Sequence, residues 1–126
     1  MQAFKTRTFA KWANGAGLDD DALAVAVAEM TRGLIDARLG GEVVKKRVAL
    51  SGRGKRGGVR TLVAFRQEEK AFFIFGFAKN ERANISSDEL RALKFLAKEL
   101  LHYSAMSLTK ALQTGELIEI EVDDDG

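Results

Sequence analysis

The sequence predicts an α+β domain built on an antiparallel sheet. Three strand-like runs follow one another between residues 43 and 78, helical patterns lie before and after them, and a last alternating run follows. Consecutive strands with helices grouped on either side of them in the sequence are typical of this class. The chain has 126 residues, of which 46% are hydrophobic, so we expect a single domain over 1–126 with an acidic tail at about 123–126.

The N-terminal part is predicted to be mainly helical. Residues 4–12 mix aromatic and basic side chains, which indicates a short strand that runs into a helix. After a break at 14–17, three aspartates at 19–21 provide an N-cap and acids that suit the positive end of a helix dipole. We expect this second helix to reach about Leu34, because its apolar residues recur at helical spacing.

The middle of the chain is predicted to form three strands. Residues 43–50 alternate between apolar and basic side chains, although Lys46 interrupts the apolar face. A glycine-rich loop is expected at 51–58, after which 59–66 alternate again. Residues 71–78 (AFFIFGFA) are apolar on both faces, which favours a central strand covered from both sides.

The C-terminal part is predicted to contain two helices and an edge strand. Ser86 and Glu89 have the spacing of a capping box, which opens the first helix. A second helix is expected at about 104–113 and stops near Gly115. Residues 116–122 alternate apolar and acidic side chains, as an edge strand does.

The residue types that are missing exclude several kinds of site. The chain has no cysteine, so disulfides, thiolate catalysis and cysteine-bound zinc are excluded. Its one histidine, His102, stands at a helix end, where histidine more often complements the dipole than acts in catalysis. We therefore expect no metal and no cofactor. No apolar run approaches the roughly 20 residues that span a bilayer, so we expect a cytoplasmic protein without a membrane partner.

The basic residues are concentrated in one segment, which matters more than the net charge of +2. Residues 42–60 contain seven bases and one acid, a distribution that suits a polyanion. Glycines in the loop SGRGKRGGVR (51–60) allow its backbone to approach a ligand, and its cations supply donors for phosphate. The alternative is a solvated basic hairpin tip. The pattern GxxxxGK[ST] is missing, so a nucleotide-binding loop is not expected.

Two further groups of polar residues could belong to a site. Lys45, Arg47 and Arg60 lie on neighbouring predicted strands and could share one sheet face suited to an RNA backbone, or be ordinary outward-facing charges. Residues 79–82 (KNER) follow the central strand directly, a common place for active-site groups, although a loop without a role is equally compatible with them. The basic residues expected to bind RNA are Lys45, Lys46, Arg47, Arg53 and Arg56.

Two stretches resemble a known family. RVALSGRGKRGGVRTLVAF (47–65) and FGFAKNERANISSDEL (75–90) are similar to the RelE/HigB toxins of bacterial toxin–antitoxin modules, over about residues 40–100. The resemblance implies a compact domain with N-terminal helices packed on a twisted antiparallel sheet that has a basic concave face. It also implies cleavage of mRNA in the ribosomal A site without a metal, by attack of a ribose 2′-hydroxyl on the adjacent phosphate.

The resemblance also implies roles for individual residues. Arg60 would hold the phosphate, and Glu81 would be an acid–base group or a structural partner of Arg82. The family pattern has an arginine where Asn80 stands and a tyrosine close to Ser86, so the acid–base assignment does not transfer directly. The four catalytic candidates are Arg60, Lys79, Glu81 and Lys55.

The partners implied by the resemblance are a ribosome with its mRNA and a cognate antitoxin of helix-turn-helix type. DNA would be contacted only through the complex with the antitoxin. Two other functions fit the same sequence. One is a non-catalytic inhibitor of DNA gyrase on the same fold, similar to ParE, and the other is a plain RNA-binding module that leaves RNA uncut.

Overall fold

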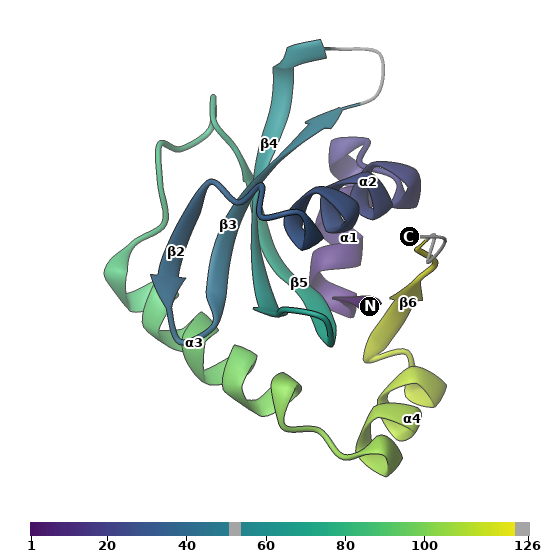
Figure 1. The fold of residues 1–126 in the computed structure, drawn as a ribbon. Helices are drawn as coiled ribbons and strands as arrows, with labels where there is room; N and C mark the ends of the chain where they lie inside the picture. The colour runs from purple at the N-terminus through teal and green to yellow at the C-terminus, as the bar shows by residue number, and fades with distance from the viewer. Residues whose placement is uncertain (51–53, 123–126) are drawn as a thin grey trace.

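The computed structural model describes residues 1–50 and 54–122, without the side chains of residues 54–57. This part of the chain forms four helices and a six-stranded sheet that does not close (Figure 1). The elements are β1 (Gln2–Thr6), α1 (Arg7–Ala16), α2 (Asp20–Thr31), β2 (Ala37–Gly40), β3 (Val43–Leu50), β4 (Gly54–Arg66), β5 (Lys70–Ala78), α3 (Ser87–Leu101), α4 (Ala105–Thr114) and β6 (Leu117–Ile120). The predicted fold class is confirmed.

The sheet is mixed and not purely antiparallel. Its strands lie in the order β2-β3-β4-β5-β1-β6, and every neighbouring pair is antiparallel except β1 and β5, which are parallel. The expectation of an antiparallel sheet is wrong for that pair. The N-terminal strand inserts between two strands that lie far from it in sequence, and no local pattern encodes this pairing. The final strand is at the sheet edge, as predicted.

Helices α1 and α2 cover one face of the sheet (Figure 1). The Thr6 hydroxyl accepts the Phe9 N–H at 3.1 Å and the Asp19 carboxylate accepts the Ala22 N–H at 2.9 Å, which fixes where the two helices begin. The second helix ends at Thr31, because Gly33 takes a left-handed φ of 87° and stops it before the predicted end. The largest fully buried side chains on this face are Phe9, Phe73, Leu23, Met30 and Val27.

Helix α3 covers part of the opposite face, and α4 follows it at the lower end of the sheet (Figure 1). The capping box is confirmed: the Glu89 N–H donates to the Ser86 hydroxyl at 3.1 Å, and the Ser86 N–H donates to the Glu89 carboxylate at 2.9 Å. Gly115 ends α4 with a φ of 79°, as the sequence predicts. The second core contains Phe4, Leu62, Phe72, Ala97, Leu100 and Leu117. None of the described helices is both long and apolar enough to cross a membrane.

Strand β5 contains a bulge that determines which of its side chains point to each face of the sheet. Leu62 pairs with Phe75 but Val63 pairs with Phe73, so Ile74 is an extra residue on β5. Ile74 and Phe75 consequently both belong to the α3 side. The strand is buried by helices on both faces, which confirms its prediction as a central strand.

The hairpins around β3 differ from the sequence prediction at both ends. A short strand, β2, which the sequence analysis did not predict, pairs with β3 through a turn at Gly41 and Glu42. Strand β4 already begins at Gly54, so the predicted loop at 51–58 is shorter than expected. The β3–β4 register shifts between Val48 and Leu50, where this hairpin approaches its tip.

Candidate functional site

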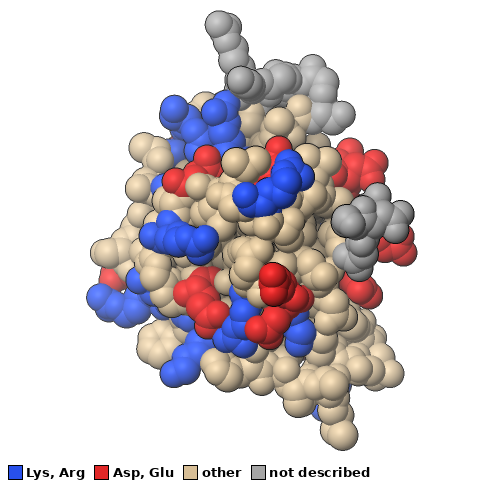
Figure 2. Space-filling model, viewed as in Figure 1, with Lys and Arg blue, Asp and Glu red and all other residues tan. Residues whose placement is uncertain are grey.

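One sheet face changes from apolar to basic along β3 and β4. Beneath α3, Val43 and Leu62 are buried in the second core. Further along the same face the side chains are Lys45, Arg47 and Arg60, of which Arg47 is exposed and the other two are half-buried. In the space-filling view, basic side chains gather mainly on the left, on the side of α3 and the β5–α3 connection, whereas acidic side chains lie on the right and in the lower centre of this face (Figure 2). We call Lys45, Arg47 and Arg60 the basic face.

Arg47 and Arg60 are direct partners in the β3–β4 register. Like charges directly opposite each other destabilise a sheet by a few tenths of a kcal/mol. The Arg47 N–H donates to the Asp36 carboxylate at 2.5 Å, which fixes the backbone there. Among the described residues, the Arg60 side chain forms no hydrogen bond or ion pair. A bound polyanion would use the donors of Arg60.

The β5 bulge places an aromatic pair beside these cations. Phe77 is the register partner of Arg60, and Phe75 lies two residues earlier on the same face. The Arg82 guanidinium carbon lies 5.8 Å from the Phe77 ring centroid and 5.9 Å from that of Phe75. Cations at this distance over aromatic rings are attracted to them. The basic face is thus bordered by a guanidinium stacked on two rings.

Arg82 is held from a second side by the first turn of α3. Its guanidinium forms a bidentate pair with the Glu89 carboxylate, with one hydrogen bond of 3.0 Å, and its Nε donates to the Asn84 carbonyl at 3.1 Å. The hydrogen bonds from Arg82 lower the pKa of Glu89 to about 2, helped by those from Ser86. The pKa of Arg82 is raised by the same pair. Glu89 therefore joins the cap of α3 to the β5–α3 connection.

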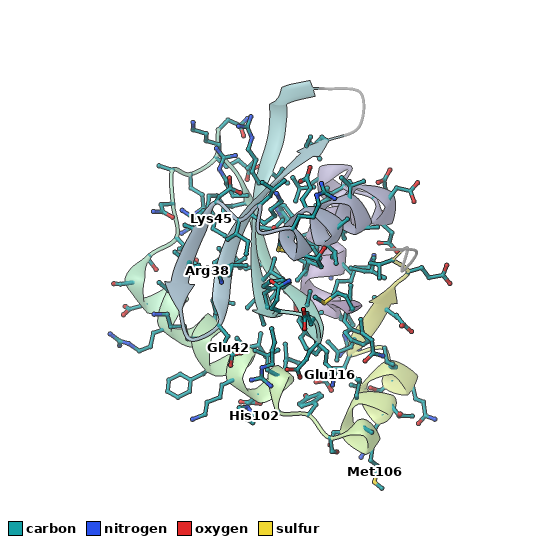
Figure 3. The ribbon with its side chains drawn as sticks, viewed as in Figure 1. Arg38, Glu42, Lys45, His102, Met106 and Glu116 are labelled. Atoms are coloured by element: carbon teal, nitrogen blue, oxygen red, sulfur yellow. The ribbon has the colours of Figure 1, made fainter. Side chains whose placement is uncertain are left out.

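The connection is also tied to the basic face itself. The Lys45 ammonium donates to the Asn84 side-chain oxygen at 3.2 Å, and the same oxygen accepts the Ile85 N–H at 2.9 Å. Figure 3 shows Lys45 extending from β3 on the side where the connection passes. Residues 79–86 thus lie against the basic face and are anchored at Arg82 and Asn84.

Lys79 and Glu81 lie at the start of this connection and are exposed. The Glu81 N–H donates to the Ala78 carbonyl at 3.0 Å, which makes a tight turn directly after β5. Neither side chain has a hydrogen-bond or salt-bridge partner among the described residues. The interpretation of Glu81 as a structural partner of Arg82 is wrong, because the carboxylate that pairs with Arg82 is that of Glu89.

Lys46 does not belong to the basic face. It points to the α1–α2 side, is 6% exposed, and its ammonium lies 2.9 Å from both the Glu29 carboxylate and the Leu34 carbonyl. Its expected role in RNA binding is therefore corrected to a structural one. Neighbouring residues on a strand face opposite sides, and Lys46 is the member of the basic run that falls on the core side.

Three predicted residues cannot be placed on this face. Arg53 lies outside the described residues, and so do the side chains of Lys55 and Arg56, although their backbone belongs to β4. His102 ends α3, where its Nδ1 lies 2.7 Å from the Lys98 carbonyl, as expected for a residue at a helix terminus. Within the described part of the chain, no three His, Asp or Glu side chains are grouped so that they could hold a metal ion.

The sequence analysis included Arg82 in the KNER segment but did not identify Glu89 as its partner, and it missed Asn84 and Phe77 as parts of this site. Arg82 and Asn84 follow the KNE segment, and a signal was available in the capping-box glutamate, which offers a carboxylate seven residues after Arg82. Phe77 could not be identified, because the position of the bulge decides which aromatic residue of AFFIFGFA lies beside Arg60.

The comparisons with known proteins identify a toxin family. The family model described as the RelE toxin of the RelE/RelB toxin–antitoxin system matches residues 1–120. No curated protein matches the chain. The family match covers every helix and strand of the fold, including the strand and helices that precede the basic face.

Proposed function

We propose that this chain, which belongs to the RelE toxin family, cleaves messenger RNA on the ribosome. Family membership makes it the toxin of a toxin–antitoxin system with a cognate antitoxin. The observation that carries the proposal is the direct pairing of Arg47 with Arg60 on a sheet whose strand β5 leads directly into the exposed Lys79 and Glu81. This arrangement supports binding of a phosphate backbone next to exposed acid–base groups.

The proposed reaction needs three functions. A base removes the proton of a ribose 2′-hydroxyl, whose oxygen then attacks the adjacent phosphorus. Cations stabilise the extra negative charge on the pentavalent phosphate. An acid protonates the 5′-oxygen as its bond to phosphorus breaks, so the products are a 2′,3′-cyclic phosphate and a 5′-hydroxyl. No metal is required in this scheme, and none is part of the proposal.

The described residues suggest who performs each step. Arg60 carries a permanent charge on a fixed strand and would hold the phosphate oxygens. Lys79 and Glu81 are the exposed titratable side chains nearest in sequence to its partner Phe77, and we propose them as the acid–base pair. Lys55 stays a candidate for the same chemistry, while Lys45, Arg47, Arg53 and Arg56 would bind the RNA backbone.

The function is tested by mixing the purified toxin with ribosomes programmed with a defined mRNA. We expect cleavage within the A-site codon, new 5′-hydroxyl ends, and activity that persists with a transition-metal chelator when magnesium is preserved. Inhibition of gyrase supercoiling without cleavage would instead identify a ParE-like inhibitor. Salt-sensitive RNA binding without either activity would identify a plain RNA-binding module. The proposal places the protein in the cytoplasm, where the ribosomes are.

Lys45 and Lys46 give a matched test of the face assignment, since they are neighbours that point to opposite sides of β3. Lys45→Ala is expected to lower the salt slope of ribosome binding by about one unit and to change the free energy of unfolding by less than about 0.5 kcal/mol. Lys46→Ala should leave the salt slope unchanged but destabilise the fold by about 1–3 kcal/mol, because the partly buried Glu29 and the Leu34 carbonyl lose their partner. Urea unfolding and binding at several salt concentrations distinguish the two. The reverse pattern would contradict the assignment.

Arg82 and Glu89 are expected to act as one positioning unit. Either Arg82→Ala or Glu89→Gln releases residues 79–84 from α3, so we expect each to reduce the single-turnover cleavage rate by about tenfold, from the loss of alignment. The double variant should be no slower than the worse single variant, because both break the same contact. Arg91→Ala is the control, since its 3.8 Å pair with Asp88 is exposed and lies within α3, outside residues 79–86. If the losses of cleavage rate add up in the double variant, Arg82 and Glu89 do not act as one positioning unit.

The pH dependence of stability provides a second readout for this pair. The folded-state pKa of Glu89 is about 2, below the value of about 4.3 for an unfolded chain. The resulting stabilisation is complete above the unfolded pKa and is lost as the pH falls through the folded pKa. The difference in unfolding free energy between wild type and Glu89→Gln should therefore be constant from pH 6 to 8 and disappear between about pH 4.5 and 2.

A further inference from the structure

A second surface on this fold has features that the proposed RNA chemistry does not use. Of the eight phenylalanines, all within the described residues, Phe95 is 67% exposed, whereas the others are buried or half-buried. Phe95 lies on α3, on the side turned away from the core residues Ala97, Leu100 and Leu101. Isolated exposed apolar residues are common, so its surroundings decide whether it has a role.

Phe95 lies in a groove between α3 and the β2–β3 turn. The groove encloses about 450 Å³ and is lined by Gly41, Glu42, Arg91, Lys94, Phe95, Lys98 and His102. A Cβ on Gly41 would come within 3.2 Å of the Lys94 side chain, so the glycine allows the turn to pack against the aliphatic part of this lysine. Figure 3 shows Glu42 of the turn and His102 of α3 on the same side of the molecule.

The groove carries an excess of positive charge. Arg91, Lys94 and Lys98 follow one another at spacings of three and four residues, so these cations form a stripe along α3. Cations at such spacings repel each other by a few tenths of a kcal/mol, a penalty that an anionic partner would remove. Among the described residues Lys94 and Lys98 have no carboxylate partner.

The one carboxylate in the groove is already neutralised. Glu42 accepts two hydrogen bonds from Arg66, at 2.8 and 2.9 Å, and these lower its pKa. Arg66 also donates to the Leu101 carbonyl at 3.3 Å, which fixes the turn against the end of α3. The groove is therefore preformed, with one exposed aromatic ring among unpaired lysines.

We propose that this groove binds an acidic segment of the cognate antitoxin, with an apolar side chain of that segment packed on Phe95. The choice of partner follows from charge complementarity and from the antitoxin that family membership implies. Aromatic side chains are enriched at protein interfaces, where they become buried anchors on binding. The surface lies on α3, whereas the basic face lies on β3 and β4, so it would hold the antitoxin independently of the RNA site.

The test uses the protein encoded next to this chain's gene as the probe, with affinities measured by calorimetry. Phe95→Ala is expected to weaken binding about 30-fold or more. The double variant K94E/K98E should weaken it at least about tenfold and reduce its salt dependence. The matched controls lie on α4: Met106→Ala removes another exposed apolar side chain, which points away from the domain in Figure 3, and K110E reverses another exposed lysine. Both controls should bind within about twofold of wild type.

The inference and the proposed function fail in different ways. Unchanged antitoxin affinity in both groove variants would overturn the inference, and so would failure of the neighbouring protein to bind the wild-type chain. If the variants instead lose ribosome binding while keeping the antitoxin, the groove serves RNA and the inference is wrong. Absence of mRNA cleavage in the wild type would overturn the proposed function alone, because the affinities do not depend on catalysis. Thermal unfolding of each variant verifies its fold.

Discussion

Replacing Arg60 with alanine is expected to reduce the single-turnover rate of mRNA cleavage on programmed ribosomes by about 10²-fold or more. Arg60 stands on a fixed strand directly opposite Arg47 and beside Phe77. Its guanidinium has no partner among the described residues, so it is available to the charge that develops on the phosphate. For the same reason its removal should change the free energy of unfolding by less than about 0.5 kcal/mol.

A matched control for this variant is Arg38→Ala. Arg38 is an exposed arginine of the same sheet, and its register partner Val44 belongs to the core on the α1–α2 side. The Arg38→Ala variant should therefore cleave mRNA at the wild-type rate. Lys55→Ala and Arg56→Ala are expected mainly to weaken binding, each reducing the salt slope by about one unit. If Arg60→Ala cleaves normally at saturating toxin while Lys55→Ala does not, the division of roles is reversed. If none of the three matters, the active face lies elsewhere.

The sequence predicted most elements of this fold, because their signals are local. Caps at Asp19, Ser86 and Gly115 fix helix ends by contacts within a few residues. Alternation along β3 and β4 separated the basic face from the core correctly. The parallel pairing of β1 with β5 was missed, because it depends on contacts between residues about 70 positions apart. The short β2 was missed because four residues carry too little pattern.

Only the part of the site that lies on the alternating strands β3 and β4 could be predicted from the residue pattern. The pattern assigns Lys45, Arg47 and Arg60 to one face, and the family resemblance adds Lys79 and Glu81. The sequence analysis grouped Lys46 with the RNA-binding residues because of its charge. Its strand position directs it to the core side instead, where it pairs with Glu29. The role of Arg82 depends on how the β5–α3 connection folds back on Phe75 and Phe77, a tertiary contact with no local signature.

A large effect on stability is expected at Gly76, because its position in β5 lies against the Trp12 ring. A Cβ built on Gly76 would lie 2.2, 2.5 and 2.6 Å from three carbons of the indole ring. The ring is rigid, packs at 5.5 Å from the Phe9 ring, and lies between α1 and the sheet, so it has little room to move. Gly76→Ala should therefore destabilise the domain by about 1–3 kcal/mol, although alanine normally improves a strand position over glycine.

Denaturant unfolding of the wild type and four variants tests this explanation. Gly15→Ala is the control, since a Cβ there meets no atom within 4 Å and its helical position favours alanine. It should be neutral or stabilise by up to about 1 kcal/mol. In a Trp12→Ala background the same Gly76→Ala change should have almost no effect, because the clashing ring is gone. An equal loss in both backgrounds would show that the strand itself, and not the indole, requires glycine. The rate at which Gly76→Ala cleaves mRNA then shows which element moves to relieve the clash. A retained rate means that α1 moves, whereas a reduced rate means that β5 moves and displaces Phe77, the partner of Arg60.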